Sequence, residues 1–452
     1  MPALAKGASS AAFRASHAAT ARAAAAQARP TARRVAGPLD RQVNIPFVEN
    51  ERGITRRQLL IGAVGLGALI ASGAGMEAVS ASKEAENAVE TLEVAPDAVS
   101  SLGSGAFAAI EGDAPLAAAG EYRLPYGTLV WANSDTYAAC LLPTEGAAPI
   151  TQAGVLSLSD GTLQVMLDKP VSPERGFDIY DVRCNEHGMI WIEANCLSGE
   201  WRVYQAPLAK GALGQASLAD SGDANYDAPF IAAAANRAFW QTAPSPHGTA
   251  LQDDSLLKSV AFGGSDVRED CRSKGRMATP VYSTGEAVVI SPRVDAAGVY
   301  HRITLIDAES GSVQDSMTLP VGMKPLEAGY VDGRFTFSFD AGYQDRGGLS
   351  NIGTYAPIDR GGASGGSWFC FDRNPTAAPA WIGPYMLVKS TRTVSGVNFA
   401  DNTYFSLPCP DACDAYGDYL ASTGTRSAAV TFTGMPSADA SEAHTLVRVW
   451  KA

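Results

Sequence analysis

The stretch Gly285-Glu286-Ala287-Val288-Val289-Ile290 contains the unit that decides the fold, a turn residue followed by a short apolar, β-branched run. Similar units begin at five other turn residues: Asp135, Gly188, Asn236, Gly333 and Asn402. The intervals between successive starts are 53, 48, 49, 48 and 69 residues. A period of about 40 to 50 residues with several short strands per repeat is typical of propeller blades, which bury their faces against neighbouring blades. The sequence therefore predicts an all-β propeller, with six blades as the first choice.

In two of the repeats, the second half is predicted to form a β-hairpin. Residues 155–158 and 163–167 form one such pair of apolar runs, and residues 303–306 and 313–319 form the other, with acidic residues and glycine between the runs. Outer strands of a blade are expected to be connected in this way.

The longest interval, from residue 333 to residue 402, contains Gly-rich and Pro/Ala-rich stretches that we interpret as loop insertions on one blade. The same interval has room for a seventh blade. A β-sandwich pair is the alternative fold. We expect the last strand, residues 446–450, to close the ring against residues 128–132, because closure removes exposed sheet edges.

An export signal precedes the β-rich region. Thr55, Arg56 and Arg57, followed by Gln58, Leu59 and Leu60, stand at the start of a run without charge that lasts until Glu77. This resembles the twin-arginine signal family, whose pattern is Ser or Thr, two arginines, a variable residue and large apolar residues. The resemblance implies export through the twin-arginine machinery. It covers about the first fifth of the chain.

The chain divides into four predicted segments. Residues 1–57 form a basic, mostly disordered cytoplasmic leader, and residues 58–76 form the hydrophobic signal helix. That helix is near the lower length limit for a membrane span, so it is either cleaved or retained as an anchor. Residues 77–120 form an acidic Ala/Ser/Gly linker, and residues 121–452 form the exported propeller-like domain. The expected location is extracytoplasmic, either on the outer face of the cytoplasmic membrane or secreted.

Charge restricts the partners of the exported part. Residues 1–82 carry ten basic and four acidic residues, whereas the remainder carries 25 basic and 43 acidic residues, a net charge of -18. Nucleic acid is excluded as a partner because its phosphates would be repelled. The predicted partners are the export machinery and an envelope protein or glycan.

The seven cysteines all lie in the exported part, where disulfides persist. Cys409 and Cys413, in the sequence Cys-Pro-Asp-Ala-Cys, are the best candidates for a disulfide. The five histidines show no metal-ligand spacing, and no cofactor motif is visible, so the sequence predicts neither a metal nor a cofactor.

Three other features bear on catalysis. Ser364 lies in a G-x-S-x-G sequence, but no helical segment follows, so a hydrolase nucleophile is not expected. Tryptophans are expected to fill the spaces between sheets rather than to stack on sugars. Carboxylates that could supply an acid and a base around a channel are Asp178, Asp181, Asp223, Asp227, Asp253 and Asp254.

Because no catalytic constellation is visible, the sequence favours a non-catalytic, envelope-associated binding or scaffold propeller over an enzyme. The first alternative is an extracytoplasmic enzyme that acts on a glycan or another polymer, with carboxylates at the channel mouth. The second alternative is an accessory subunit of an exported redox enzyme.

Overall fold

The computed structural model describes residues 89, 91–92, 99–101, 105–145, 149–296, 298–321, 324–340, 352–355, 368–372, 377–390 and 392–452. Within these ranges the regular structure is entirely β, with no helix. Among the same residues, none forms a helix that is long and apolar enough to cross a membrane. The leader and the signal helix predicted from the sequence lie outside the described residues.

Most strands belong to antiparallel sheets whose members follow one another in the chain. The first sheet contains β4 (Leu129–Trp131), β5 (Tyr137–Pro143), β6 (Thr151–Ser157) and β7 (Leu163–Leu167). The second contains β8 (Asp178–Cys184), β9 (Gly188–Asn195), β10 (Glu200–Ala209), β11 (Ala212–Leu213) and β12 (Ser217–Gly222). The third contains β13 (Tyr226–Ala234), β14 (Arg237–Pro244), β15 (Ser255–Ala261) and β16 (Arg268–Ser273).

The pattern continues toward the C-terminus. The fourth sheet contains β17 (Tyr282–Ser283), β18 (Ala287–Ile290), β19 (Arg302–Asp307) and β20 (Val313–Thr318). Next come the pair β21 (Lys324–Val331) and β22 (Arg334–Asp340), and a sheet of β1 (Val99–Ser101), β24 (Trp368–Asp372) and β23 (Ile352–Tyr355). A further sheet contains β25 (Ala380–Ile382), β26 (Tyr385–Lys389), β27 (Val394–Asn398) and β28 (Thr403–Ser406), flanked by β2 (Ala108–Ala109) and β30 (Gly424–Arg426).

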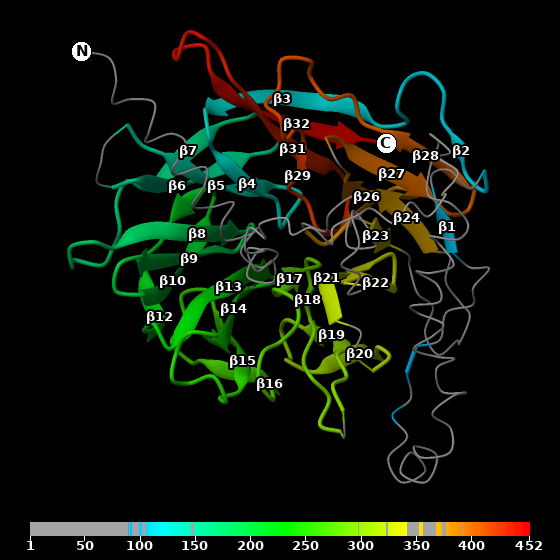
Figure 1. Cartoon of the computed structure of the whole chain (residues 1–452). Coiled ribbons are helices and arrows are strands. Elements are labelled where there is room, and N and C mark those ends of the chain that lie inside the picture. Colours follow the sequence, from blue (N-terminus) through cyan, green and yellow to red (C-terminus); the bar gives the residue numbers. More distant parts are fainter. Residues whose placement is uncertain are drawn as a thin grey trace, which may run out of the picture.

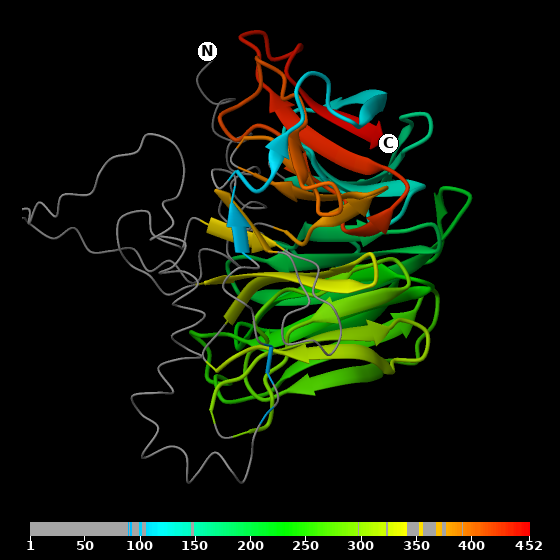
Figure 2. The same ribbon diagram turned by 90° about the vertical axis from the view of Figure 1, so that its right-hand side faces the viewer.

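The last sheet joins the two ends of the described chain. It contains β29 (Tyr419–Leu420), β31 (Ala429–Met435), β32 (His444–Lys451) and β3 (Ala117–Pro125). The sheets follow one another around a common centre (Figure 1), and in the side view they appear as successive layers (Figure 2). This arrangement confirms the all-β, propeller-like fold class.

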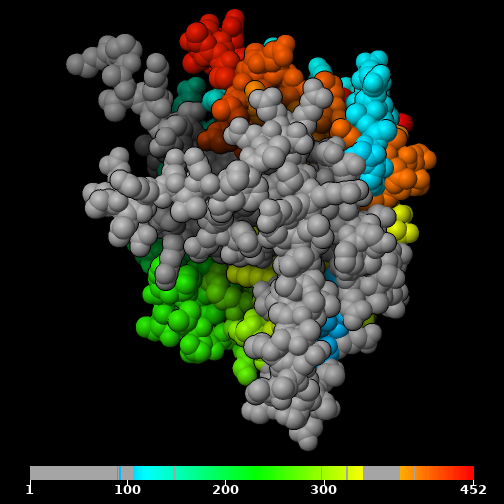
Figure 3. All heavy atoms as spheres, turned by 45° about the vertical axis from the view of Figure 1, so that its right-hand side comes forward, coloured from blue at the N-terminus to red at the C-terminus, as the bar shows by residue number. Residues whose placement is uncertain are grey.

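Strand β3 closes the ring by pairing with β32 from Ala117 opposite Lys451 to Pro125 opposite His444. The prediction that residues 446–450 pair with residues 128–132 was therefore wrong. β1, β2 and the start of β3 lie within the segment interpreted as a linker, and β2 pairs in parallel with β28. Figure 3 shows these cyan residues against the orange residues near position 400.

Turn chemistry explains much of the local structure. Asp332 and Gly333 have φ values of 47° and 72°, as a two-residue type I′ hairpin requires, and they connect β21 to β22. The two hairpins predicted from the sequence are confirmed as β6–β7 and β19–β20. Asn402, in contrast, connects β27 to β28, whereas the turn after β25, the first of the four consecutive strands of this sheet, is at Gly383, between β25 and β26.

The core lies between neighbouring sheets. Its largest fully buried side chains include Trp191, Trp240, Phe239 and Phe337. Trp201 and Trp450 are also buried, which confirms for these tryptophans the predicted packing role. Gly188 is required where β9 meets the third sheet, because a Cβ atom there would lie 2.1 Å from the ring of Phe262.

Candidate functional site

The inner ends of several sheets are connected by one segment, residues 422–427. β30 within it pairs in parallel with β25, and Ser422 forms a bridge with Ala132 beside the first sheet. Thr423 Oγ1 donates to the carbonyl of Ser283 at 2.9 Å, and Thr425 Oγ1 accepts from the amide of Asp332 at 3.0 Å. The segment therefore contacts four of the sheets near the centre of the ring.

Arg426 brings a positive charge to this centre. Its Nε donates to the carbonyl of Thr423 at 2.9 Å, and its buried Nη2 has no hydrogen-bond partner among the described residues. Burial lowers the pKa of the guanidinium, and the negative charges of Asp135, Glu186 and Glu286 oppose that effect. Carboxylates are therefore present near the centre, as Asp135, Glu186 and Glu286, but they lie near the positive charge of Arg426.

An open cleft of about 770 Å³ lies between the outer strands of the second and third sheets. Strands β10, β12, β15 and β16 contribute to its walls. Three aromatic residues line it, Phe177, Trp201 and Tyr226. Its acidic residues are Glu200, Asp220, Asp223, Asp253 and Asp254, and its basic residues are Arg202, Lys258 and Arg272.

Hydrogen bonds hold several of these groups in place. Tyr226 Oη donates to Asp253 Oδ2 at 2.5 Å, and this hydrogen bond is the main cause of the raised pKa of Tyr226. Lys258 Nζ lies 2.9 Å from Asp220 Oδ2. The Arg202 guanidinium forms two hydrogen bonds to Glu174 and lies over the ring of Phe177 at 4.6 Å.

The six carboxylates predicted from the sequence separate into two groups. Asp223, Asp253 and Asp254 all line the cleft. The structure places the others away from it: Asp178 accepts from the amide of Ile150, Asp181 pairs with Arg183, and Asp227 pairs with Arg276. No cluster of three or more metal-ligating side chains is present in the described part of the chain.

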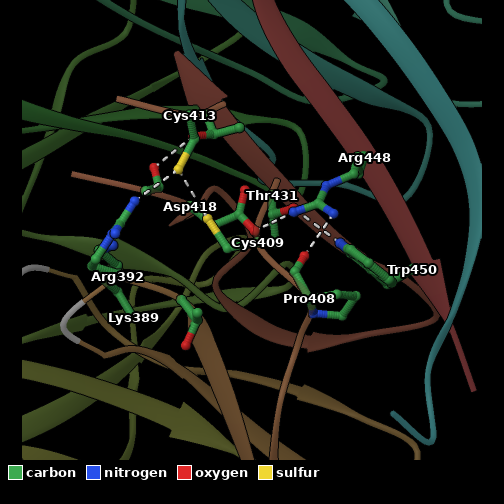
Figure 4. A network of polar contacts seen from close by, with 12 residues as sticks. Lys389, Arg392, Pro408, Cys409, Cys413, Asp418, Thr431, Arg448 and Trp450 are labelled. Atoms are coloured by element: carbon green, nitrogen blue, oxygen red, sulfur yellow. Dashed lines mark hydrogen bonds and ion pairs between the residues drawn. The ribbon is translucent and has the colours of Figure 1, made fainter. Parts of the chain in front are cut away.

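A second polar site surrounds Cys409 and Cys413, in the loop between β28 and β29 (Figure 4). The two sulfur atoms lie 3.3 Å apart as free thiols. Arg392 Nη2 donates to Cys413 Sγ at 3.2 Å. Burial, followed by the hydrogen bond with Cys413, raises the pKa of Cys409 to about 11, and the negative charge of Asp418 adds to this effect.

Asp418 is fully buried beneath this loop and pairs with Arg448 of β32. Burial raises the pKa of Asp418 to about 6, although the charges of Arg448 and Lys389 favour the carboxylate. Arg448 also donates to the carbonyl of Pro408 at 2.7 Å and lies over the ring of Trp450. Asp418 Oδ1 has no hydrogen-bond partner within the described ranges.

Sequence reasoning identified the two cysteines but missed Arg392, Asp418 and Arg448. These three residues lie on separate elements, and no spacing in the sequence connects them. Ser364 and the export-signal residues Thr55, Arg56, Arg57, Leu59 and Leu60 lie outside the described residues.

Comparison with known proteins gives similarity only at the level of structure. No protein-family model and no curated protein sequence matches the chain. Similar solved structures include a prolyl endopeptidase, with a TM-score of 0.47 and 12% identity over 72% of this chain and 46% of that one. A puromycin hydrolase has a TM-score of 0.43 and 14% identity over 72% and 51% of the two chains. The chain thus spans about half the length of these two proteins.

A third similar structure is an oligogalacturonate lyase in complex with manganese, with a TM-score of 0.43 and 8% identity over 73% of this chain and 89% of that one. All three similar structures are enzymes. The interpretation that favoured a non-catalytic binding or scaffold module over an enzyme is contradicted by this set of structures. Because the identities are 8 to 14%, no residue role is transferred from them.

Proposed function

We propose that this protein is an extracytoplasmic enzyme that cleaves a carbohydrate polymer bound in the cleft between the second and third sheets. The observation that carries the proposal is the combination of the half-buried aromatic ring of Tyr226 with five carboxylates around one open cavity of about 770 Å³. Aromatic faces stack on sugar rings, and carboxylates bind sugar hydroxyls and transfer protons at the glycosidic bond.

The charges within the cleft restrict the class of polymer that can bind there. Asp220 is paired with Lys258, and Arg272 lies between Asp254 and Glu269. Arg202 is engaged by Glu174. Glu200, Asp223 and Asp253 lack an ion pair among the described residues, so the field inside the cleft is negative. The proposed substrate is therefore a polymer of neutral or cationic sugars, and a polyuronate would be repelled.

Asp253 is the proposed proton-transfer group, because the hydroxyl of Tyr226 fixes one of its oxygens. The axis is the less suitable place for catalysis, since Asp135 there accepts the amide of Ser427 and Arg426 balances the neighbouring acids.

The test measures new reducing ends released from a neutral glucan, a cationic amino-sugar polymer and a polyuronate. Asp253→Asn is expected to lower kcat/KM by at least about 100-fold, as loss of a general acid or base does. Asp113→Asn, at an exposed position far along the chain from the cleft, is the matched control. Cleavage of the polyuronate alone, or unchanged activity of Asp253→Asn, would refute the proposal.

We also propose that the ring has seven blades instead of six. Strands β21 and β22 together with β23 and β24 would make one blade, since β22 and β23 lie next to each other. With the turn at Gly383 in place of Asn402, the interval after Gly333 becomes 50 residues, close to the earlier ones. An experimental structure that includes residues 341–376 would test this count.

The export route is part of the same proposal, supported by Thr55, Arg56, Arg57, Leu59 and Leu60. The twin-arginine machinery would carry the folded domain out of the cytoplasm, and residues 58–76 would be either cleaved or kept as an anchor. Replacing Arg56 and Arg57 together with lysine is expected to retain the protein in the cytoplasm, as cell fractionation would show. Normal export of that variant would contradict the proposal.

A further inference from the structure

The Cys409–Cys413 loop is accessible to a reaction partner. Both cysteines are partly exposed, and two of the three residues between them, Asp411 and Ala412, are exposed. The amide of Cys413 donates to the carbonyl of Pro410 at 3.1 Å, and this turn brings the second sulfur back toward the first. The 3.3 Å separation of the two sulfurs means that little movement is needed to form a bond between them.

The surroundings of the two sulfurs differ. Cys413 accepts an N–H of Arg392, whose positive charge stabilises a thiolate. Burial is the main cause of the raised thiol pKa of Cys409, and the negative charge of the nearby Asp418 adds to it. Two thiols within reach of each other, one in contact with an arginine and the other near a buried carboxylate, are a suitable arrangement for thiol–disulfide exchange.

Asp418 has a feature that its ion pair does not explain. One of its oxygens pairs with Arg448, but Oδ1 is buried and has no partner within the described ranges. A buried acceptor that lacks a donor is costly, so such a group needs an explanation. An oxygen that receives a proton during a reaction at the neighbouring thiol provides one.

We propose that Cys409 and Cys413 form a reversible dithiol–disulfide site that reacts with the disulfide of an exported protein or of a small thiol. Cys413 is the attacking sulfur and Cys409 the resolving sulfur, and Asp418 accepts the proton of Cys409. This site lies between the last two sheets, separate from the cleft assigned to the polymer.

The exchange balances without another reactant. The Cys413 thiolate forms a bond to one sulfur of the substrate disulfide, the substrate S–S bond breaks, and the first thiolate leaves and takes a proton from water. Cys409 then gives its proton to Asp418 and attacks Cys413 Sγ, which releases the second substrate thiolate. Two protein thiols are oxidised to one disulfide, and one substrate disulfide is reduced to two thiols.

The first experiment equilibrates the reduced full chain with mixtures of reduced and oxidised glutathione, then alkylates free thiols and measures the mass of the peptide that contains residues 409–413. We expect a reversible transition in which both thiols are lost together. In Cys409→Ser, a mixed disulfide with glutathione should form on Cys413 at least about tenfold faster than on Cys196, an exposed free cysteine of the same chain.

Two further variants separate the roles. Arg392→Gln should slow the first step about fivefold at pH 7, whereas Arg175→Gln, at another exposed arginine, should leave it unchanged. Asp418→Asn should prolong the mixed disulfide at least about tenfold, because the second step loses its proton acceptor. A disulfide-bridged peptide is then used in place of oxidised glutathione. A faster reaction with the peptide identifies a protein disulfide as the substrate, and a slower reaction identifies a small disulfide.

The proposal is overturned if both cysteines stay fully alkylatable in oxidised glutathione alone. It is also overturned if Cys413 in the Cys409→Ser variant reacts no faster than Cys196. Neither result depends on whether a polymer binds in the cleft.

Discussion

The pH dependence of stability tests the burial of Asp418 most directly. Burial raises its pKa from the ordinary value of 3.8 to about 6, so the folded protein holds this proton more tightly than the unfolded chain does. The difference corresponds to about 3 kcal/mol of stability. That contribution is complete below about pH 4, where both states are protonated, and it is lost as the pH rises through 6.

The perturbation is Asp418→Asn, which keeps the shape of the side chain and removes its titration. The substitution leaves the charge of Arg448 without its partner, but arginine stays protonated throughout this range, so that cost is the same at every pH. The free energy of unfolding of the variant, relative to that of the wild type, should therefore rise by up to about 3 kcal/mol between pH 4 and pH 7.

Guanidinium denaturation of both proteins at pH 4, 5, 6 and 7 measures this difference, with Asp113→Asn as the control for an exposed acid. The comparison between proteins is essential, because His301 changes stability in the opposite direction over a similar range. A difference between Asp418→Asn and wild type that stays constant from pH 4 to pH 7 would refute the reasoning.

Four other variants test the packing and the remaining buried polar groups. His301 has its pKa lowered to about 4, first by burial and then by the charges of Lys324 and Arg293, so wild-type stability should fall by about 3 kcal/mol as the pH drops from 6.5 toward 4. His301→Gln should remove that loss in the same denaturation series, and an unchanged acid response would contradict the assignment. Gly417→Ala should destabilise by more than about 2 kcal/mol, because φ is +65° and the new Cβ would lie 1.9 Å from the carbonyl oxygen of Arg392. Gly333→Ala, with φ of +72° and open space around the Cβ, should cost only about 1 to 2 kcal/mol in the same assay, and equal losses would show that the contact does not matter. Trp191→Phe should cost about 1 to 3 kcal/mol in thermal and chemical denaturation, since it removes the 3.0 Å hydrogen bond to the fully buried Glu193, and a neutral result would show that water replaces the donor.

The fold class could be predicted because the repeating unit is local. A turn residue followed by β-branched or aromatic residues specifies the hairpin at Asp332 and Gly333 without help from distant parts of the chain. The same rule misled at Asn402, which also starts a strand with aromatic residues but connects β27 to β28. The first of the four consecutive strands of that sheet, β25, has only three residues and follows a proline-rich stretch, so its turn at Gly383 gave a weaker signal.

The ring closure could not be predicted from local pattern. β3 begins with Ala117, Ala118 and Ala119, residues of low strand propensity, and its partner β32 lies more than 300 residues away. The thiol site was predicted only in part for the same reason. The spacing of Cys409 and Cys413 identified the two cysteines, but Asp418 and Arg448 come into contact only because β32 pairs inside the last sheet.

The filled centre of the ring decides where chemistry can occur in this protein. Ser422 and Thr423 are buried there, and Arg426 neutralises carboxylates that would otherwise attract a cationic substrate to the axis. The open cavity between the second and third sheets has the opposite character, since Glu200, Asp223 and Asp253 have no ion pair among the described residues. We therefore propose that substrates bind at the sides of the blades or on their loops. Both sites proposed for this protein, the cleft and the Cys409–Cys413 loop, lie in such positions.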